Sequence, residues 1–346
     1  MKKWVANKMG FKDIETSYNT YLLQNKPELT IFMLTYNREK LLSIAIDSIL
    51  QQTYKNFFFL ILDNCSTDNT SLVVESYKDL RLNYLYRKSE SLCPNTQFAL
   101  NFCKTKYFII LHDDDVYSPT YLDDITNIMN KSDYAALSVA PYYINQDGKI
   151  TSNFKYTNNI KSYNDYEYLN NYLNKSFTTL IYPSVIYKTE LFKEFPNFAG
   201  NPDVGPAGDQ YIWLQTCRNG NKIAYYDKPL IYYRLHNSQN TYTNLGIMDI
   251  VLIVYLSSDD YYWNYFLENK RLVCQKIFRS YKAFYKNVLL DITNIERCSI
   301  LFDCRLIKLF KKDLYCFLLF IIVLTTYRNV DLVKFVLSRK LKNENR

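Results

Sequence analysis

Short apolar runs alternate with amphipathic stretches through the first third of the chain, and this alternation limits the possible folds more than any other feature. The runs "ELTIFMLTYN" and "NFFFLILDNC" are each followed by apolar residues at helical spacing, such as Leu42, Ile46 and Ile49 after the first. Runs of this kind are typical of strands that are buried on both faces. We therefore expect an α/β fold, with a mostly parallel sheet between two layers of helices.

Polar residues follow three of the predicted strands, at positions 35–37, 63–66 and 113–115. The carboxyl ends of parallel strands meet at one edge of a sheet, where ligands of such folds bind. Residues 113–115 are three consecutive aspartates. Adjacent carboxylates repel one another, so this cluster needs a cation beside it.

The last quarter of the chain is basic and reads as helical. Residues 270–346 carry 17 Lys and Arg against 6 Asp and Glu. The apolar run 314–327 is followed and preceded by basic residues, and as a helix it would reach about 21 Å, short of the roughly 30 Å core of a bilayer. It fits either a helix lying in the surface of an anionic membrane or the core of a helical bundle.

The cysteines and the amino terminus bear on the compartment. Eight cysteines include no CxxC pair, which favours free thiols in a reducing cytosol. The first 24 residues contain no apolar run able to serve as a signal peptide. We expect a cytoplasmic protein, either free or peripheral on the inner face of the membrane. No nucleic-acid-binding motif accompanies the basic charge.

Four segments carry a family resemblance: "TIFMLTYNRE", "QQTY", "LILDNCSTDNT" and "LHDDDVYSPTYL". In this order and spacing they resemble the nucleotide-binding half of family 2 glycosyltransferases, which have the GT-A fold. "PAGDQYIWLQTC" and "IYYRLHNSQNT" look like the acceptor-side and closing segments of that family. The resemblance implies a GT-A domain over 27–241, after an N-terminal helical extension, 1–26. Residues 242–346 would be a helical region for membrane docking or oligomerisation.

The family's acidic motif binds Mn²⁺ or Mg²⁺, which holds the diphosphate of a nucleotide sugar. This resemblance implies that Asp114 is a metal ligand, with Asp115 as the rival and Asp113 on the ribose side. Strand alternation, if it continued past the strand, would instead pair Asp113 with Asp115. His236 resembles a third metal ligand found in some relatives. For His112 we expect orientation of a neighbour rather than metal binding.

The donor nucleotide would bind at the first two strand ends. Asp63 matches the position that hydrogen-bonds the nucleobase, which suits uracil and therefore UDP. Asn64 and Cys65 stand where Asp and Gly are frequent in the family. The residues expected to bind the donor are Thr35, Tyr36, Asn37, Arg38, Asp63, Asn64, Asp113 and Arg234.

Asp209 of "GDQYIW" is the expected catalytic base, and its alternative role is that of a helix N-cap. The resemblance implies metal-dependent, inverting transfer from a UDP-sugar to a hydroxyl of a glycan or lipid-linked glycan, as in bacterial surface polysaccharide assembly. One alternative is a sugar nucleotidyltransferase, although "LTYNREK" lacks the Gly-rich phosphate loop that such enzymes use. Another is a non-catalytic relative that binds nucleotide sugars.

Overall fold

The computed structural model describes residues 11–87, 92–174, 180–193, 208–235, 247–257 and 259–288. The chain divides into two compact units. The first unit takes in Met1–Tyr168, Thr178–Asn201 and Ile212–His236, and the second Leu169–Phe177, Pro202–Tyr211 and Asn237–Arg346. The domain limits predicted from the sequence stay predictions.

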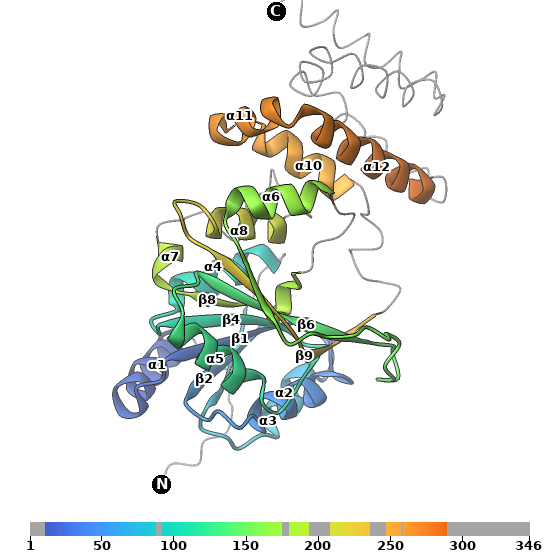
Figure 1. The fold of residues 1–346 in the computed structure, drawn as a ribbon. Helices are drawn as coiled ribbons and strands as arrows, with labels where there is room; N and C mark the ends of the chain where they lie inside the picture. Colours follow the sequence, from blue (N-terminus) through green and yellow to red (C-terminus); the bar gives the residue numbers. More distant parts are fainter. Residues whose placement is uncertain are drawn as a thin grey trace, which may run out of the picture. The chain divides into compact units, whose positions relative to one another are not determined.

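Strands and helices alternate through the first part of the chain, as predicted (Figure 1). The elements up to the sixth strand are α1 (Phe11–Asn25), β1 (Leu29–Thr35), α2 (Leu42–Leu50), β2 (Phe57–Asp63), α3 (Thr70–Glu75), β3 (Leu82–Tyr86), α4 (Leu92–Phe102), β4 (Tyr107–His112), β5 (Val116–Tyr117), α5 (Tyr121–Lys131) and β6 (Ala136–Ile144). The elements after it are β7 (Ile160–Tyr163), α6 (Asp165–Asn174), the 3₁₀ helix η1 (Tyr182–Ser184), β8 (Ile186–Lys188), α7 (Glu190–Lys193), α8 (Gly208–Thr216), β9 (Ile223–Arg234), α10 (Ile247–Leu256), α11 (Asp260–Glu268) and α12 (Lys270–Val288).

In the part of the chain that the structure describes, nine strands form one sheet in the order β3-β2-β1-β4-β8-β6-β9-β5, with β7 also paired to β9. Strands β1 to β4 are parallel, and so are β6 and β9, whereas β8 is antiparallel to both of its neighbours. The expected mixed, mostly parallel sheet is confirmed. Because β5 follows β4 closely in sequence but pairs at the far end of the sheet, the sheet curls.

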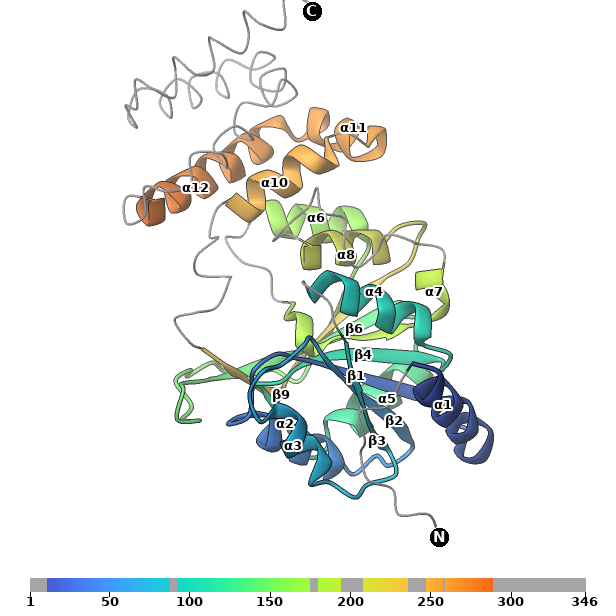
Figure 2. The same cartoon turned by 180° about the vertical axis from the view of Figure 1, so that it is seen from behind.

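Helices cover both faces of the central strands. Alternate residues of a strand point to opposite faces, and in β1 and β2 the residues on both faces are buried. On one face, Ile31 and Ile109 belong to a buried cluster with residues of α2, α3 and α5. On the other, the ring of Tyr18 in α1 lies 4.5 Å from that of Phe58 and 4.7 Å from that of Phe102 in α4. Figures 1 and 2 both place α4 and the pair α2 and α3 on opposite sides of the strands.

The three predicted polar strand ends lie level with one another. Thr35 at the end of β1 pairs with Asp63 at the end of β2, and Leu34 pairs with His112 at the end of β4. Helix α3 begins after Asn69, and Oδ1 of Asp68 accepts a hydrogen bond from the backbone N of Thr70 at 3.0 Å. The shared edge of the sheet therefore carries the candidate site.

The described residues beyond 245 are helical, as predicted. In the second unit, Asp249 of α10 forms an ion pair of 3.1 Å with the buried Lys276 of α12. The same carboxylate accepts hydrogen bonds from Tyr172 of α6 and, at 2.6 Å, from Ser280. Among the described helices, none is both long and apolar enough to cross a membrane. The apolar run 314–327 lies outside the described residues.

Candidate active site

The three aspartates form a buried bend between β4 and β5. Asp113, Asp114 and Asp115 are only 6%, 9% and 1% exposed. The bend lies at the edge of the sheet where β1 and β2 also end, since those strands are parallel to β4 and in register with it. The predicted convergence of acidic and polar strand ends is therefore present in the fold.

Arg38, in the loop after β1, forms ion pairs with the first two aspartates. Its Nε lies 3.1 Å from Oδ1 of Asp113, and its Nη2 lies 3.7 Å from Oδ2 of Asp114. The second oxygen of Asp113 accepts a hydrogen bond of 3.4 Å from the backbone N of Tyr36. Burial nevertheless raises the pKa of Asp113 to about 6. One guanidinium therefore does not fully compensate the cluster.

Asp115 is the most buried of the three, and one of its carboxylate oxygens has no hydrogen-bond partner among the described residues. Its Oδ1 accepts a hydrogen bond of 2.8 Å from the backbone N of Arg234. Its Oδ2 has no hydrogen-bond partner among the described residues, and Nδ1 of His112 lies 4.0 Å from it. Burial, followed by repulsion from Asp114, raises the pKa of Asp115 well above its ordinary value. A bare carboxylate oxygen in such a place is costly unless a cation binds it.

The residues present fit a divalent cation. His112, Asp114 and Asp115 each offer a ligand atom, and these atoms all lie within 4.8 Å of one another. Carboxylate oxygens with an imidazole nitrogen suit Mn²⁺, and carboxylates suit Mg²⁺. His112 was expected only to orient a neighbour. Its place as the last residue of β4, directly before the aspartates, is the signal that points to membership of this group. His236, the other histidine, lies outside the described residues.

The loops after β1 and β2 are tied together beside the aspartates. The backbone N of Asn37 donates to Oγ of Ser66 at 2.8 Å, and Oδ1 of Asn37 accepts from the backbone N of Thr67 at 2.8 Å. Asn37 has a positive φ of 52°. Tyr36, which directly precedes Asn37, is 52% exposed, whereas Thr35 is buried. The predicted nucleotide pocket would therefore have an exposed aromatic ring at its rim.

Asp63, the predicted partner of the nucleobase, is fully buried and already hydrogen-bonded. Its Oδ2 accepts from the hydroxyl of Tyr84 at 2.6 Å, and its Oδ1 accepts from the backbone N of Ser66 at 2.7 Å. The next residue, Asn64, accepts a hydrogen bond of 3.3 Å from Asn95 through its side-chain oxygen. A carboxylate has more acceptor positions than these two bonds use, so the base-binding role stays a prediction.

Arg234, the last residue of β9, was expected to contact the donor diphosphate. The structure buries it, at 5% exposed, and directs its guanidinium toward backbone carbonyls. Nε donates to the carbonyl of Asp114 at 2.8 Å, and Nη1 donates to those of Asn145 and Gln146 at 3.1 and 2.8 Å. The contact with the diphosphate stays a prediction.

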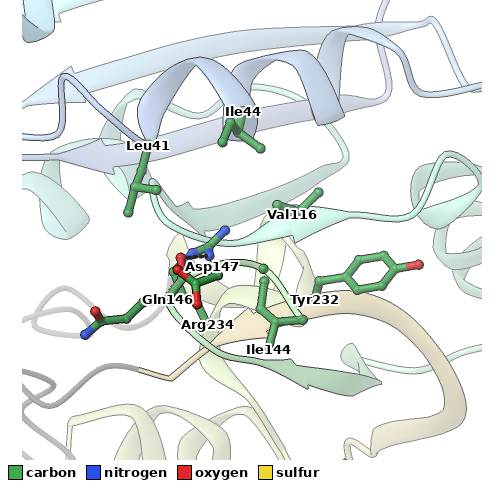
Figure 3. A pocket seen from close by; sticks show the side chains of 9 residues that line it. Leu41, Ile44, Val116, Ile144, Gln146, Asp147, Tyr232 and Arg234 are labelled. Atoms are coloured by element: carbon green, nitrogen blue, oxygen red, sulfur yellow. Dashed lines mark hydrogen bonds between the residues drawn. The ribbon is translucent and has the colours of Figure 1, made fainter. Parts of the chain in front are cut away.

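Arg234 and Gln146 also line a mostly apolar pocket of about 320 Å³. Figure 3 shows Leu41, the residue before α2, and Ile44 of α2 on one side of the pocket, and Arg234 among the residues on the other. Val116, which directly follows the aspartates, also lines it. The pocket and the acidic cluster therefore share one chain segment and one arginine.

Asp209, the predicted base, lies in the first turn of α8 and belongs to the second unit. Its Oδ1 accepts a hydrogen bond of 2.7 Å from the backbone N of Gln210. Burial raises the pKa of Asp209 to about 6. A carboxylate with such a pKa is ionised at neutral pH yet more basic than an ordinary aspartate, as a general base should be. Its catalytic role stays a prediction.

Comparison with protein families and known proteins gives consistent matches. The model of the family described as "Glycosyl transferase family 2" matches residues 30–195. An uncharacterized glycosyltransferase of Methanocaldococcus jannaschii is 25% identical over 271 residues, which are 77% of this chain and 88% of the relative. An Escherichia coli enzyme, UDP-Glc:alpha-D-GlcNAc-diphosphoundecaprenol beta-1,3-glucosyltransferase WfaP, is 26% identical over 211 residues, 60% of this chain and 77% of the relative.

Solved structures show the same fold. Residues 1–349 of S. aureus TarS in complex with UDP match with a TM-score of 0.56 and 16% identity, over 78% of this chain and 76% of that one. The complex of the same protein with UDP-GlcNAc matches with a TM-score of 0.58 and 17% identity, over 82% and 81%. The GT-A type of fold expected from the sequence is confirmed.

Proposed function

The chain is a glycosyltransferase of family 2, as its motifs predicted, and from this premise we propose a metal-dependent, inverting transfer from a UDP-sugar to a hydroxyl of a lipid-linked glycan. The single observation that carries the proposal is the buried acidic cluster, in which Oδ2 of Asp115 has no hydrogen-bond partner among the described residues. Such an arrangement needs an additional cation, and a metal-bound diphosphate supplies one.

The metal would be held by Asp114 and Asp115, together with His112 or the predicted ligand His236. A bound Mn²⁺ or Mg²⁺ neutralises charge that develops on the leaving diphosphate. Arg38 lies 3.7 Å from Asp114 and is 36% exposed in its side chain, so it can also meet a phosphate oxygen. These residues would bind and orient the leaving group.

Asp63, Thr35 and the exposed ring of Tyr36 would receive the nucleoside. UDP is the proposed nucleotide because the relative WfaP is named as a UDP-Glc enzyme, and because a carboxylate acceptor suits the N–H of uracil. Asn37 would support this pocket through its hydrogen bond to Thr67 in the loop after β2, and Asn64 through its hydrogen bond with Asn95 of α4. Asp113 would lie on the ribose side.

Asp209 would act as the base. Its carboxylate takes the proton of the acceptor hydroxyl while that oxygen attacks the anomeric carbon, and the bond from that carbon to the diphosphate breaks. Attack opposite to the leaving group inverts the configuration, and no covalent enzyme intermediate forms. The pKa of about 6 keeps Asp209 ionised at neutral pH.

The proposed acceptor is a glycan linked to a lipid through a diphosphate, as in the name of WfaP. Such acceptors are assembled at membranes in the making of bacterial surface polysaccharides. The basic residues 270–346 would bring the protein to the inner face of the membrane. Vesicle flotation with and without residues 300–346 tests this part, and equal flotation of both forms would remove it.

A thermal-shift screen of nucleotide sugars tests the donor and the metal together, since a ligand that binds only the folded state raises the melting temperature. We expect UDP-sugars to raise it only when Mn²⁺ is present. No shift with any nucleotide sugar, with or without Mn²⁺, would contradict the proposal. Release of pyrophosphate from UTP and a sugar phosphate would instead identify a nucleotidyltransferase.

A further inference from the structure

Arg234 makes an unusual set of contacts for a buried arginine. Its backbone N donates to Oδ1 of Asp115, its Nε to the carbonyl of Asp114, and its Nη1 to the carbonyls of Asn145 and Gln146. The four distances are 2.8, 2.8, 3.1 and 2.8 Å. One residue thus joins the acidic bend to the turn that follows β6.

The guanidinium makes three of these four bonds, those from Nε and Nη1 to backbone carbonyls, whereas the bond to Asp115 comes from the backbone. Its planar fork carries several donors in fixed directions, so it can serve carbonyls on two separate segments at once. A lysine ammonium has the same charge but a single nitrogen, and it cannot reproduce the fork. The three bonds to carbonyls therefore depend on the geometry of the arginine side chain as well as on its charge.

The acidic bend has few other anchors on this side. It leads into β5, a strand of two residues in which Val116 pairs with Tyr232 and Tyr117 with Ile231 of β9. The backbone N of Ser118 donates to the carbonyl of Leu230 at 2.9 Å. All of these contacts follow the aspartates in sequence. The hydrogen bonds of Arg234 act on the aspartates themselves.

We propose that Arg234 is a positioning residue that fixes Asp114 and Asp115 in the arrangement that binds the divalent cation. Its backbone N holds one oxygen of Asp115, whose other oxygen has no hydrogen-bond partner among the described residues, and its Nε holds the peptide of Asp114. The side chain therefore acts on the two aspartates through the peptide that joins them. Groups that orient metal ligands typically change metal affinity 10- to 100-fold when they are mutated, by order of magnitude. The inference rests on the proposed function, since it assumes that the cluster binds a metal.

Two substitutions of Arg234 separate the fork from the charge. The side chain is only 5% exposed, but it borders the 320 Å³ pocket (Figure 3). Arg234→Lys keeps the positive charge beside Asp115 and removes the fork. Arg234→Gln removes both, and it keeps the inference testable if the lysine variant fails to fold.

Arg81 provides a matched control in the same unit. It also hydrogen-bonds a backbone carbonyl, that of Leu50 at 3.0 Å, and a carboxylate, that of Asp79 at 2.9 Å from its Nε. It lies just before β3, at the end of the strands opposite to the acidic cluster. Arg81→Lys therefore removes a fork of the same kind without touching the cluster.

The measurement is the affinity of the full chain for Mn²⁺ alone. Electron paramagnetic resonance gives the concentration of free Mn²⁺ during the titration, and near-UV circular dichroism checks that each variant is folded. We expect Arg234→Lys to weaken Mn²⁺ binding by roughly 10- to 100-fold, Arg234→Gln to weaken it at least as much, and Arg81→Lys to leave it unchanged.

Three other outcomes are informative. If the Arg234 variants melt at lower temperature but bind Mn²⁺ like the unmodified protein, Arg234 is merely structural and the inference is wrong. If Arg81→Lys weakens binding as much as Arg234→Lys, the effect is general and the inference is equally wrong. If the unmodified protein binds no Mn²⁺, the metal in the proposed function fails, and this inference fails with it.

Discussion

The Nε of Arg38 lies 3.1 Å from Oδ1 of Asp113, and this ion pair joins the loop after β1 to the acidic cluster after β4. Arg38 and a bound metal ion would both neutralise the negative charge of these aspartates. Arg38→Met should therefore lower the stability of the metal-free protein by about 1 kcal/mol, a modest amount because the guanidinium is partly exposed. It should also enlarge the stabilisation that Mn²⁺ gives, because the metal then has more charge to neutralise.

Urea unfolding with EDTA and with Mn²⁺ measures both effects of Arg38→Met. Lys188→Met is the control, since its ion pair of 2.7 Å with Asp133 lies on β8 away from the cluster. Equal Mn²⁺ stabilisation of the Arg38 variant and the unmodified protein would mean that the metal does not share charges with this arginine.

Asp209 gives a prediction about the pH dependence of activity. The base must be ionised to accept a proton, and burial raises its pKa to about 6. The rate of sugar transfer should therefore fall as the pH drops through about 6, while Asp209→Asn should lose roughly 10²- to 10⁴-fold in kcat and still bind the donor. A variant that keeps normal transfer would exclude Asp209 as the base.

The same carboxyl gives a prediction about stability. Its folded-state pKa lies above the unfolded value near 4, so the ionised side chain destabilises the fold above about pH 6, and the penalty disappears as the pH falls toward 4. Asp209→Asn should raise the melting temperature at pH 8 and leave it unchanged near pH 4. Asp133→Asn is a control of opposite sign, because Lys188 lowers the pKa of Asp133. A pH-independent shift for Asp209→Asn would contradict the prediction.

Much of the fold was readable in the sequence because each strand in the first unit is a continuous apolar run. β1 and β2 are buried at every position, and this needs helices on both faces. The three strand ends and their shared edge follow from that pattern. The late strands were harder to predict, since β8 is only three residues long and lies between β4 and β6 rather than beside β7 or β9, the strands next to it in sequence.

The site was predictable in its residue types and less so in its contacts. The hydrogen bond from Tyr84 to Asp63 and the burial of Arg234 depend on which strands are neighbours, and local sequence does not state that. Gln52 is a similar case: it is fully buried, and its side chain bonds the carbonyl of Ser118 and the backbone N of Leu122. The "QQTY" segment thus supports the chain just after the acidic bend.

Tyr84 gives a prediction about the buried carboxylate of Asp63. Tyr84→Phe removes a hydrogen bond of 2.6 Å to Oδ2 of Asp63, and it should cost about 1–3 kcal/mol of stability and weaken UDP binding. Urea unfolding and UDP titration measure these losses. Tyr107→Phe, whose hydroxyl binds the side chain of Asn130, is the control and should leave UDP binding unchanged. If Tyr84→Phe binds UDP as well as the unmodified protein does, the predicted role of Asp63 in binding the nucleobase is contradicted.

Cys65 gives a prediction about backbone strain. It has a φ of 69° in the turn after β2, a left-handed conformation that costs an ordinary residue about 1–2 kcal/mol and a glycine almost nothing. Cys65→Gly should therefore be more stable than Cys65→Ala, which keeps the strain and likewise loses the thiol contact of 3.1 Å with Tyr86. Equal unfolding midpoints for the two variants would show that the turn is not strained.

The central claim is that the acidic bend holds a divalent cation and, through it, the diphosphate of the donor. Crystals of the full chain grown with MnCl₂ and UDP, with diffraction recorded at the manganese absorption edge, test it most directly. The account predicts an anomalous peak within bonding distance of carboxylate oxygens of Asp114 or Asp115, and of UDP phosphate oxygens, at about 2.0–2.6 Å. UDP bound elsewhere, or no peak at this bend, would contradict it.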